Sequence, residues 1–215
     1  MADALNTKGD GAPLVYLSTD YVFSGHTGSS KQLRTTPYVE TDATDPQCVY
    51  GASKLAGEHA SQSYNNTIVL RISWVFGQDG HNFVKSILRA ARRFDRERSS
   101  DDRAQALRVV DDQFGAPCGT PSISRAVLTA LEQNIEPGTY HFANAPHTNW
   151  HDFAKAIVEE ALGLGLLDQP IEVLPQPTSA LNQRATRPAD GRLDADKLGR
   201  ALDLPATPWI EDLRK

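Results

Sequence analysis

Side chains that could carry out a proton transfer stand at suggestive positions in this sequence. Tyr50 and Lys54 are four residues apart, so on a helix they would project from one face about a turn apart. A free phenol has a pKa of about 10, and a neighbouring ammonium favours the phenolate and lowers that pKa toward neutral pH, where general acid–base catalysis is efficient. Ser18 and Thr19 add hydroxyl groups. The set predicts protonation of a carbonyl oxygen as hydride reaches its carbon.

A buried strand would bring the hydroxyl groups to this site. Residues 14–17 form a short apolar run, as expected of a strand that is buried on both faces in a parallel sheet. Ser18, Thr19 and Asp20 follow it and would lie at the carboxyl edge, where open α/β sheets bind ligands. Residues 67–72 predict a second buried strand. With a helix between the two strands, the order favours a parallel α/β architecture.

A helix would present Tyr50 and Lys54 together. The pattern Tyr-x-x-x-Lys arises easily by chance, so its setting carries the argument. Pro46 lies shortly before Tyr50, and apolar residues recur at helical spacing through about Ser63. Tyr50 is therefore predicted to stand in the first turn of the helix.

Further elements are predicted along the rest of the chain. They are a helix over 82–94, a strand over 107–110, a helix over 122–131, a strand over 138–143 and a helix through about 162 that is capped by Thr148. Six prolines between 170 and 215 predict a tail that wraps in short pieces. The charged segment 95–102 has no apolar period and is interpreted as a solvated helix end and insertion.

Composition excludes several classes of protein. The 215 residues carry a formal net charge of −5, which argues against a nucleic-acid partner. Cys48 and Cys118 stand apart, which suits a reducing compartment and makes a disulfide framework improbable. Neither a hydrophobic leader nor an apolar run of about 20 residues occurs, so no membrane association is expected. These features predict a cytoplasmic protein.

His147 and His151 are the one pair that invites a metal site. They are four residues apart, but His147 precedes the expected helix and no third ligand has suitable spacing. We therefore predict no metal.

Several ordered motifs resemble a known family. They span nearly the whole chain, at residues 18–23, 40–44, 50–58, 70–76, 82–83, 112–117, 150–153, 187–188 and 192–194. The chain resembles the extended short-chain dehydrogenase/reductases and, within them, the dTDP-4-dehydrorhamnose reductases. That resemblance implies a Rossmann-like doubly wound sheet with a smaller α/β substrate-binding part. It also implies reduction of the 4-keto group of dTDP-4-dehydro-L-rhamnose to dTDP-L-rhamnose with NADPH or NADH.

The resemblance also implies roles for individual residues. Thr19 would hydrogen-bond the keto oxygen, Tyr50 would donate the proton, and Lys54 would hold the nicotinamide ribose and lower the pKa of Tyr50. Ser18 would lie with Tyr50 and Lys54 on the cofactor side. The residues that would line the sugar and nucleotide side are Asp20, Tyr21, Trp74 and Asn82. Three of these keep plainer alternatives, namely a turn former for Asp20, a core residue for Trp74 and a helix cap for Asn82. The residues that could meet the diphosphate are Arg184, Arg187 and Arg192.

One departure from the family is large. The family begins with a strand, a glycine-rich turn and a helix that receives the cofactor pyrophosphate. None of the glycine pairs in this sequence follows a strand in that way, so we expect a chain that lacks about three βαβ units of roughly 30 residues each. Residues 1–80 would then be the later part of the cofactor domain with the catalytic helix. Residues 81–215 would mainly bind substrate, with 107–143 as a segment that could return to the sheet.

Two functions stay open at this stage. The first is the reductase, truncated or completed by a separate chain that supplies the missing half, with a homodimer left open. The second is a regulatory subunit like the β subunit of methionine adenosyltransferase, which has similar segments around Tyr21 and Tyr50. The segments 73–74 and 112–117 favour the reductase.

Overall fold

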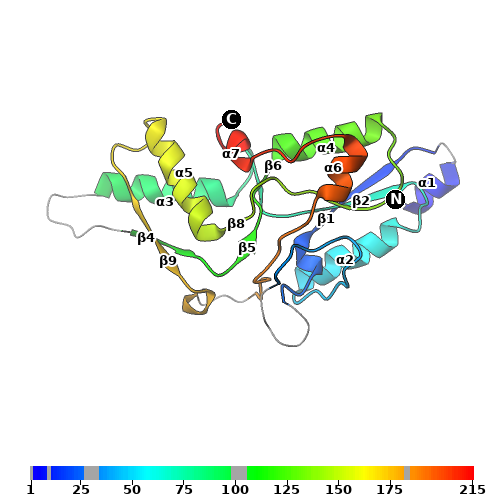
Figure 1. Ribbon diagram of the computed structural model, residues 1–215, viewed down its shortest axis with the longest axis horizontal. Coiled ribbons are helices and arrows are strands. Elements are labelled where there is room, and N and C mark those ends of the chain that lie inside the picture. The colour runs from blue at the N-terminus through cyan, green and yellow to red at the C-terminus, as the bar shows by residue number, and fades with distance from the viewer. Residues whose placement is uncertain (1, 9–10, 27–33, 98–105, 182–184) are drawn as a thin grey trace.

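The computed structural model describes residues 2–8, 11–26, 34–97, 106–181 and 185–215. The molecule is elongated, with two groups of elements side by side along its long axis (Figure 1). One group holds the main sheet and its helices, which we call the sheet lobe. The other holds two long helices and a strand pair, which we call the helical lobe.

The sheet lobe is built on three parallel strands. β1 (Leu14–Thr19), β2 (Thr67–Ile72) and β7 (Gly138–His141) stand in the order β1-β2-β7. Five of the six residues of β2 are buried, as its central place requires. Thr19 is paired in register with Ile72, so β1 and β2 end together at one edge of the sheet.

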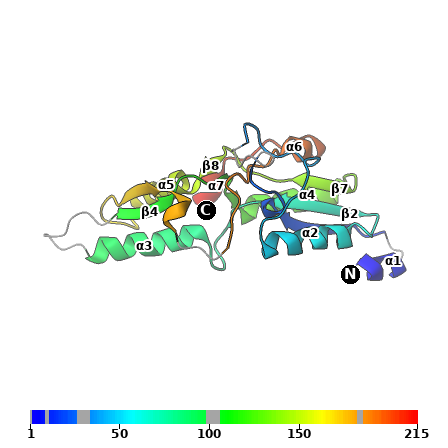
Figure 2. The ribbon, with the colours of Figure 1, turned by 90° about the horizontal axis from the view of Figure 1, so that it is seen from below.

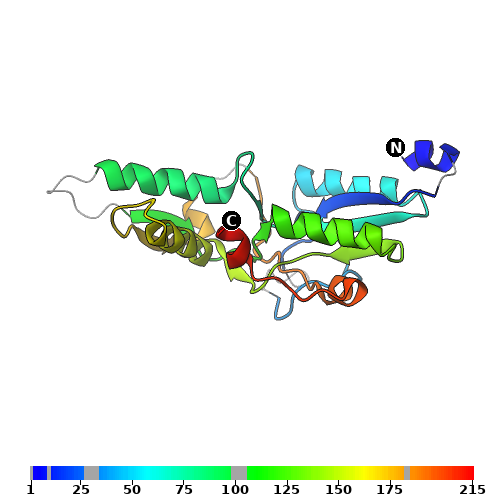
Figure 3. The same ribbon diagram turned by 90° about the horizontal axis from the view of Figure 1, so that it is seen from above.

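Helices cover both faces of this sheet. α2 (Val49–Ser61) contacts β1 and β2 on one face, and α4 (Thr120–Glu132) lies across the other (Figure 3). α6 (Asp196–Leu202) packs beside α4 and against β7. The apolar cluster between these elements includes Leu70, Ala126 and Leu198. The predicted α/β class with a parallel sheet is confirmed.

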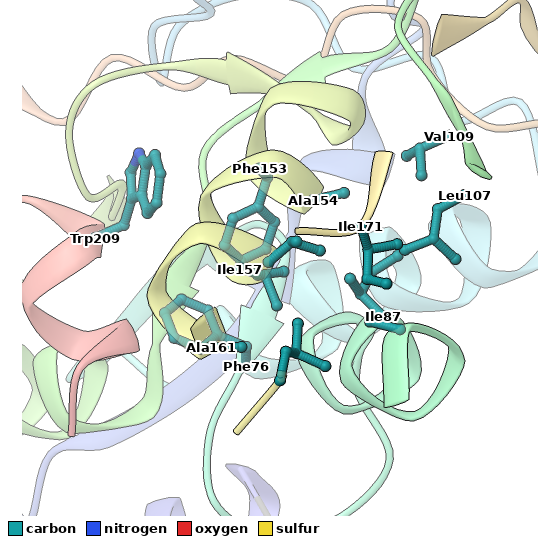
Figure 4. Close-up of a cluster of buried hydrophobic side chains, with 13 residues drawn as sticks. Phe76, Ile87, Leu107, Val109, Phe153, Ala154, Ile157, Ala161, Ile171 and Trp209 are labelled. Atoms are coloured by element: carbon teal, nitrogen blue, oxygen red, sulfur yellow. The ribbon is translucent and has the colours of Figure 1, made fainter. Parts of the chain in front are cut away.

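The helical lobe has an apolar core of its own. α3 (Phe83–Glu97) packs against α5 (Trp150–Gly163), and α5 also contacts the parallel pair β4 (Ala106–Val110) and β9 (Glu172–Gln176). Side chains from all of these elements meet in one cluster around α5 (Figure 4). The layering of α3 under β4 and α5 is clear from below (Figure 2).

Short elements complete the described part of the chain. They are α1 (Ala2–Lys8), the 3-10 turn η1 (Asp20–Val22), β3 (Val75–Phe76), β5 (Phe114–Gly115), β6 (Cys118–Gly119), β8 (Thr148–Asn149), η3 (Thr178–Ala180) and α7 (Trp209–Leu213). Pairing joins β3 to β6 and β5 to β8. Among the described helices, not one combines the length and apolar character that crossing a bilayer demands.

Most predicted elements occur close to their expected places, with one correction. Asn149, not Thr148, caps α5, because the Asn149 side chain accepts the hydrogen bond from the Asp152 amide while Thr148 belongs to β8. Most of the predicted insertion lies in 98–105, outside the described residues. The strand at 138–141 joins the main sheet, whereas the proposed domain boundary after residue 80 stays a prediction.

Candidate functional site

A cleft of about 850 Å³ lies at the carboxyl edge of the main sheet, where the two lobes meet. The ends of β1 and β2, the first turns of α2 and the start of α5 all contribute to its lining. This is the edge at which open parallel sheets bind ligands. The predicted site residues that line it are Ser18, Thr19, Asp20, Tyr21, Tyr50, Lys54 and Trp74.

Tyr50 stands in the first turn of α2, as predicted, and half of it is exposed. The helix begins close to η1, and a Cβ on Gly51 would lie only 2.1 Å from the carbonyl oxygen of Tyr21. Glycine is therefore required after Tyr50 for α2 to reach the cleft. The rings of Tyr21 and Tyr50 meet edge to face, with their centroids 5.5 Å apart. This contact holds the Tyr50 ring at the cleft wall while its surface remains accessible.

Lys54 lies one turn further along α2. Its ammonium donates a hydrogen bond to the carbonyl oxygen of Leu17 and lies 4.5 Å from the centre of the Tyr16 ring. An ammonium has three donors, so this bond leaves two for other partners. The end of β1 thus holds Lys54 at the cleft that Tyr50 also lines.

Thr19 and Asp20 lie at the turn from β1 into η1, and both are buried. The Thr19 hydroxyl accepts a hydrogen bond from the Tyr21 amide at 3.3 Å and donates one to Asp20 Oδ1 at 3.0 Å. Burial raises the pKa of Asp20 to about 7, and the hydrogen bond from Thr19 partly opposes that shift. Burial also raises the pKa of Tyr21 to about 12.

Ser18 faces a buried polar network instead of an open surface. Its hydroxyl donates to Glu58 on α2, and Glu58 forms two hydrogen bonds with the guanidinium of Arg71, at 2.9 and 2.7 Å. Arg71 also lies 3.4 Å from Nε2 of His141, and Nδ1 of that ring lies 3.0 Å from the carbonyl oxygen of Tyr38. Because arginine only donates, Nε2 of His141 accepts and Nδ1 carries the hydrogen.

This network was not predicted from the sequence. Glu58 and Arg71 are 2% and 5% exposed, and a charge inside an otherwise apolar strand is a signal that a buried partner exists. The signal was present at Arg71 within residues 67–72. Its partners could not be found from spacing, because they come from different elements.

Trp74 forms another part of the cleft wall. Its backbone has φ of 40°, a conformation that a bulky residue rarely adopts. Its ring stacks on Trp150 with the centroids 3.6 Å apart, and Trp150 also lines the cleft. The sequence analysis quoted Trp150 within a motif but gave it no role, and its place at the start of α5 was the available signal.

Asn82 does not line the cleft. Its side chain accepts from the Lys85 amide at 3.0 Å and donates to the carbonyl oxygen of Gly77 at 2.8 Å, so it caps α3. Its role in substrate binding stays a prediction. Arg187 lines the cleft, whereas Arg192 binds the buried carboxylate of Asp190. Arg184 lies outside the described residues.

His147 and His151, the pair considered as metal ligands, do not line the cleft. His147 bonds to the carbonyl oxygen of Leu193, and His151 lies against Asp152 and the carbonyl oxygen of Val173. Within the described ranges, no three histidine, cysteine or acidic side chains gather as metal ligands would.

The family described as RmlD substrate binding domain matches residues 2–215. The chain belongs to this family. A dTDP-4-dehydrorhamnose reductase from Salmonella typhimurium is 39% identical over 204 residues, which cover 93% of this chain and 62% of that protein. The RmlD-type chain described here therefore spans about three fifths of the length of that relative.

Solved structures agree with this assignment. A dTDP-4-dehydrorhamnose reductase ortholog from Clostridium acetobutylicum superimposes with a TM-score of 0.80 at 30% identity, over 99% of this chain and 67% of that one. The Bacillus anthracis enzyme of the same name, in complex with NADP, gives 0.77 at 32% identity over 94% of this chain and 64% of that one. The RmlD-type chain thus shares the fold of extended reductases.

Proposed function

We propose that the protein carrying this chain reduces the 4-keto group of dTDP-4-dehydro-L-rhamnose to give dTDP-L-rhamnose, with NADPH or NADH as the hydride donor. The observation that carries the proposal is the gathering of Thr19, Tyr50 and Lys54 around one cleft at the carboxyl edge of a parallel sheet. The reductase names of the relatives supply the substrate class. A cytoplasmic location follows from the use of such a cofactor and from the unpaired cysteines.

In this proposal Tyr50 gives its phenolic proton to the keto oxygen. The exposure of half of Tyr50 lets a substrate reach its hydroxyl, and the edge-to-face contact with Tyr21 limits the positions that the ring can take. Lys54 has two free donors after its bond to Leu17, which suit a ribose hydroxyl and the phenol oxygen. In the same proposal, Thr19, which also lines the cleft, donates to the keto oxygen.

The cofactor site of this chain fits only part of a dinucleotide. Tyr50 and Lys54 offer donors for the ribose beside the nicotinamide, which would supply the hydride when bound, and Ser18 at the end of β1 lines the same cleft. No glycine-rich turn that follows a strand is present in the sequence. The pyrophosphate would therefore be held by residues outside this chain, in a longer form of the protein or in a separate chain.

The substrate side of the cleft carries the stacked pair Trp74 and Trp150. An indole face suits the apolar side of a 6-deoxysugar, and the hydroxyl of Tyr21 can bond a sugar hydroxyl. Arg187, which lines the cleft, would meet the anionic diphosphate in this proposal. The names of the curated relatives favour this substrate over the regulatory alternative.

The test replaces the proposed proton donor. Tyr50→Phe, in a preparation of the protein that binds NADPH, should lower the rate of ketone reduction by about 10²–10⁴-fold, the usual range for a lost general acid. NADPH binding, measured by its fluorescence, should persist. Tyr140→Phe is the matched control, because that hydroxyl bonds the carbonyl oxygen of Glu136 away from the cleft. Undiminished turnover in Tyr50→Phe would refute the proposal.

A further inference from the structure

The hydrogen of the Thr19 hydroxyl, which a ketone oxygen would need, is already donated to another group. This hydroxyl has one hydrogen and two lone pairs. One lone pair accepts from the Tyr21 amide, and the hydrogen points to Oδ1 of Asp20 at 3.0 Å. A ketone oxygen can only accept, so in this arrangement Thr19 has no hydrogen to offer it. A group that releases the hydrogen is needed.

Asp20 has the surroundings to be that group. It is 2% exposed, and its Oδ2 lies against the backbone of Gly191, where a Cβ would come within 2.4 Å. Burial favours the neutral carboxyl and raises its pKa, which the hydrogen bonds from Thr19 and from the backbone of Asp20 and Tyr21 only partly oppose. A neutral carboxyl has a proton to donate.

The groups that face Asp20 do not compete with it near neutral pH. Burial raises the pKa of Tyr21 to about 12 and that of the Cys118 thiol to about 11, so both stay protonated. Arg187 bonds to Tyr21, and Asp190, which precedes Gly191, is held by Arg192. Asp20 is therefore the group at this turn whose charge changes near pH 7.

We propose that Asp20 is a positioning residue whose protonation state sets the direction of the Thr19 hydroxyl. The neutral carboxyl donates to Thr19 Oγ1, which then accepts from Asp20 and from Tyr21 and turns its own hydrogen toward the keto oxygen. The ionised carboxylate draws that hydrogen back and leaves Thr19 able to accept from an alcohol. The inference rests on the proposed function and deepens it. The ketone substrate should bind best when Asp20 is protonated, whereas the alcohol product can also bind when Asp20 is ionised.

The first experiment does not depend on catalysis. The carboxyl carbon of Asp20 is followed by NMR against pH in protein with ¹³C-labelled aspartate, and its signal is assigned by its absence in Asp20→Asn. A midpoint near pH 7 is expected, and Thr19→Val should move it upward, because the Thr19 hydrogen bond lowers the pKa of Asp20. Asp45→Asn, which removes an exposed carboxyl, should leave the Asp20 titration unchanged. A midpoint near pH 4, or no shift in Thr19→Val, overturns the inference whether or not the protein is a reductase.

The second experiment uses the pH profile of kcat/KM for ketone reduction in a preparation that binds NADPH. Between pH 6.5 and 8.5 the wild-type value should fall about tenfold or more as Asp20 ionises. Asp20→Asn keeps a permanent N–H donor toward Thr19, so its profile should lose that fall, whereas Asp20→Ala should be impaired at every pH. An equally steep fall in Asp20→Asn overturns the inference. Absence of any ketone reduction in the wild-type protein, with the NMR result as expected, refutes the proposed function and leaves the Asp20–Thr19 pair standing.

Discussion

The two lobes that form the cleft have interiors stabilised by different kinds of interaction. Behind the catalytic wall, the sheet lobe buries a chain of polar groups that runs from Ser18 through Glu58 and Arg71 to His141. The helical lobe, behind the wall of stacked indoles, is packed by an apolar and aromatic cluster around Phe153. The position of one wall is fixed by directional hydrogen bonds and an ion pair, and that of the other by close packing of apolar side chains.

The difference matches what each wall has to do. Proton transfer requires reacting atoms in a defined geometry, and Glu58 ties α2, the helix of Tyr50 and Lys54, to the end of β1 that carries Thr19. A buried ion pair adds little net stability compared with apolar residues, so position is its clearer benefit here. A sugar face needs only a flat apolar surface, which packed aromatic rings provide.

The largest effect is expected when the polar chain is broken. Glu58→Ala leaves the guanidinium of Arg71, 5% exposed, without its carboxylate, and should lower the free energy of unfolding by about 3–5 kcal/mol. Urea denaturation followed by circular dichroism measures this loss. The comparison between the lobes predicts that catalytic activity falls as well, because α2 loses its tie to β1.

A matched control comes from a second glutamate–arginine pair with the same two-bond geometry. Glu160 binds Arg214 at 2.9 and 2.7 Å, but here the arginine side chain is 60% exposed and the glutamate side chain 24%. Water screens the pair, so Glu160→Ala should change stability far less than Glu58→Ala. Equal losses in the two variants would show that burial does not distinguish these pairs, and the contrast between the lobes would fail.

The contrast also explains how far sequence reasoning could reach. The strand over 67–72 and the catalytic helix were predicted because their signals are local, namely an apolar run and a repeat of apolar residues near Pro46. The same local logic placed Thr19 and Asp20 at the strand end. Among the described residues, those elements bring most of the predicted residues to a single cleft, with Asn82 and Arg192 as the exceptions.

The polar chain and the indole pair could not be predicted because their partners are distant in sequence. Arg71 and His141 are 70 residues apart, and Trp74 and Trp150 are joined only by tertiary packing. The interpretation of Asn82 as a helix cap, which was kept as an alternative, describes its contacts in the structure. A side chain with a good local role gives no sequence signal that separates it from a ligand contact.

The second prediction concerns pH, to which the sheet lobe should respond. The pKa of Asp20 is raised from 3.8 to about 7, so between these values the folded state holds a proton that the unfolded state has lost, and stability falls as pH rises. One pKa unit corresponds to about 1.4 kcal/mol. Asp20→Asn should therefore raise the free energy of unfolding by on the order of 4 kcal/mol at pH 8 and by little at pH 4. Denaturation of both proteins at the two pH values measures it. A gain that is equal at pH 4 and pH 8 would contradict this origin.

His141 should give the opposite sign in the same lobe. Burial, with the nearby Arg71 cation, lowers its pKa to about 3, so the unfolded state takes up a proton below pH 6.5 that the folded state refuses. Stability linked to His141 is therefore present above pH 6.5 and is lost as pH falls. The stability of the sheet lobe should therefore fall at alkaline pH because of Asp20 and at acid pH because of His141.

The third prediction tests the apolar core of the helical lobe, whose contribution to the free energy of unfolding should not depend on pH. Ile157 on α5 is 1% exposed within the apolar cluster (Figure 4), and Ile157→Ala should lower the free energy of unfolding by about 3 kcal/mol through lost burial and a cavity. The loss should be the same at pH 5 and at pH 8. A loss that differed between the two pH values would mean that a titrating group is coupled to this cluster, and the contrast between the lobes would fail.

The smallest effect is expected at the start of α5, where the helical lobe meets the cleft. The Asn149 side chain accepts from the Asp152 amide at 2.8 Å, so Asn149→Ala should lower the free energy of unfolding by about 1 kcal/mol. Thr148→Ala is the control, because the Thr148 hydroxyl makes only a long contact of 3.4 Å with the carbonyl oxygen of Asn149. Trp150 is the first residue of α5, so loss of the cap should also loosen its stack on Trp74, which the tryptophan fluorescence of the folded protein can report. A larger loss in Thr148→Ala than in Asn149→Ala would restore the cap that the sequence favoured.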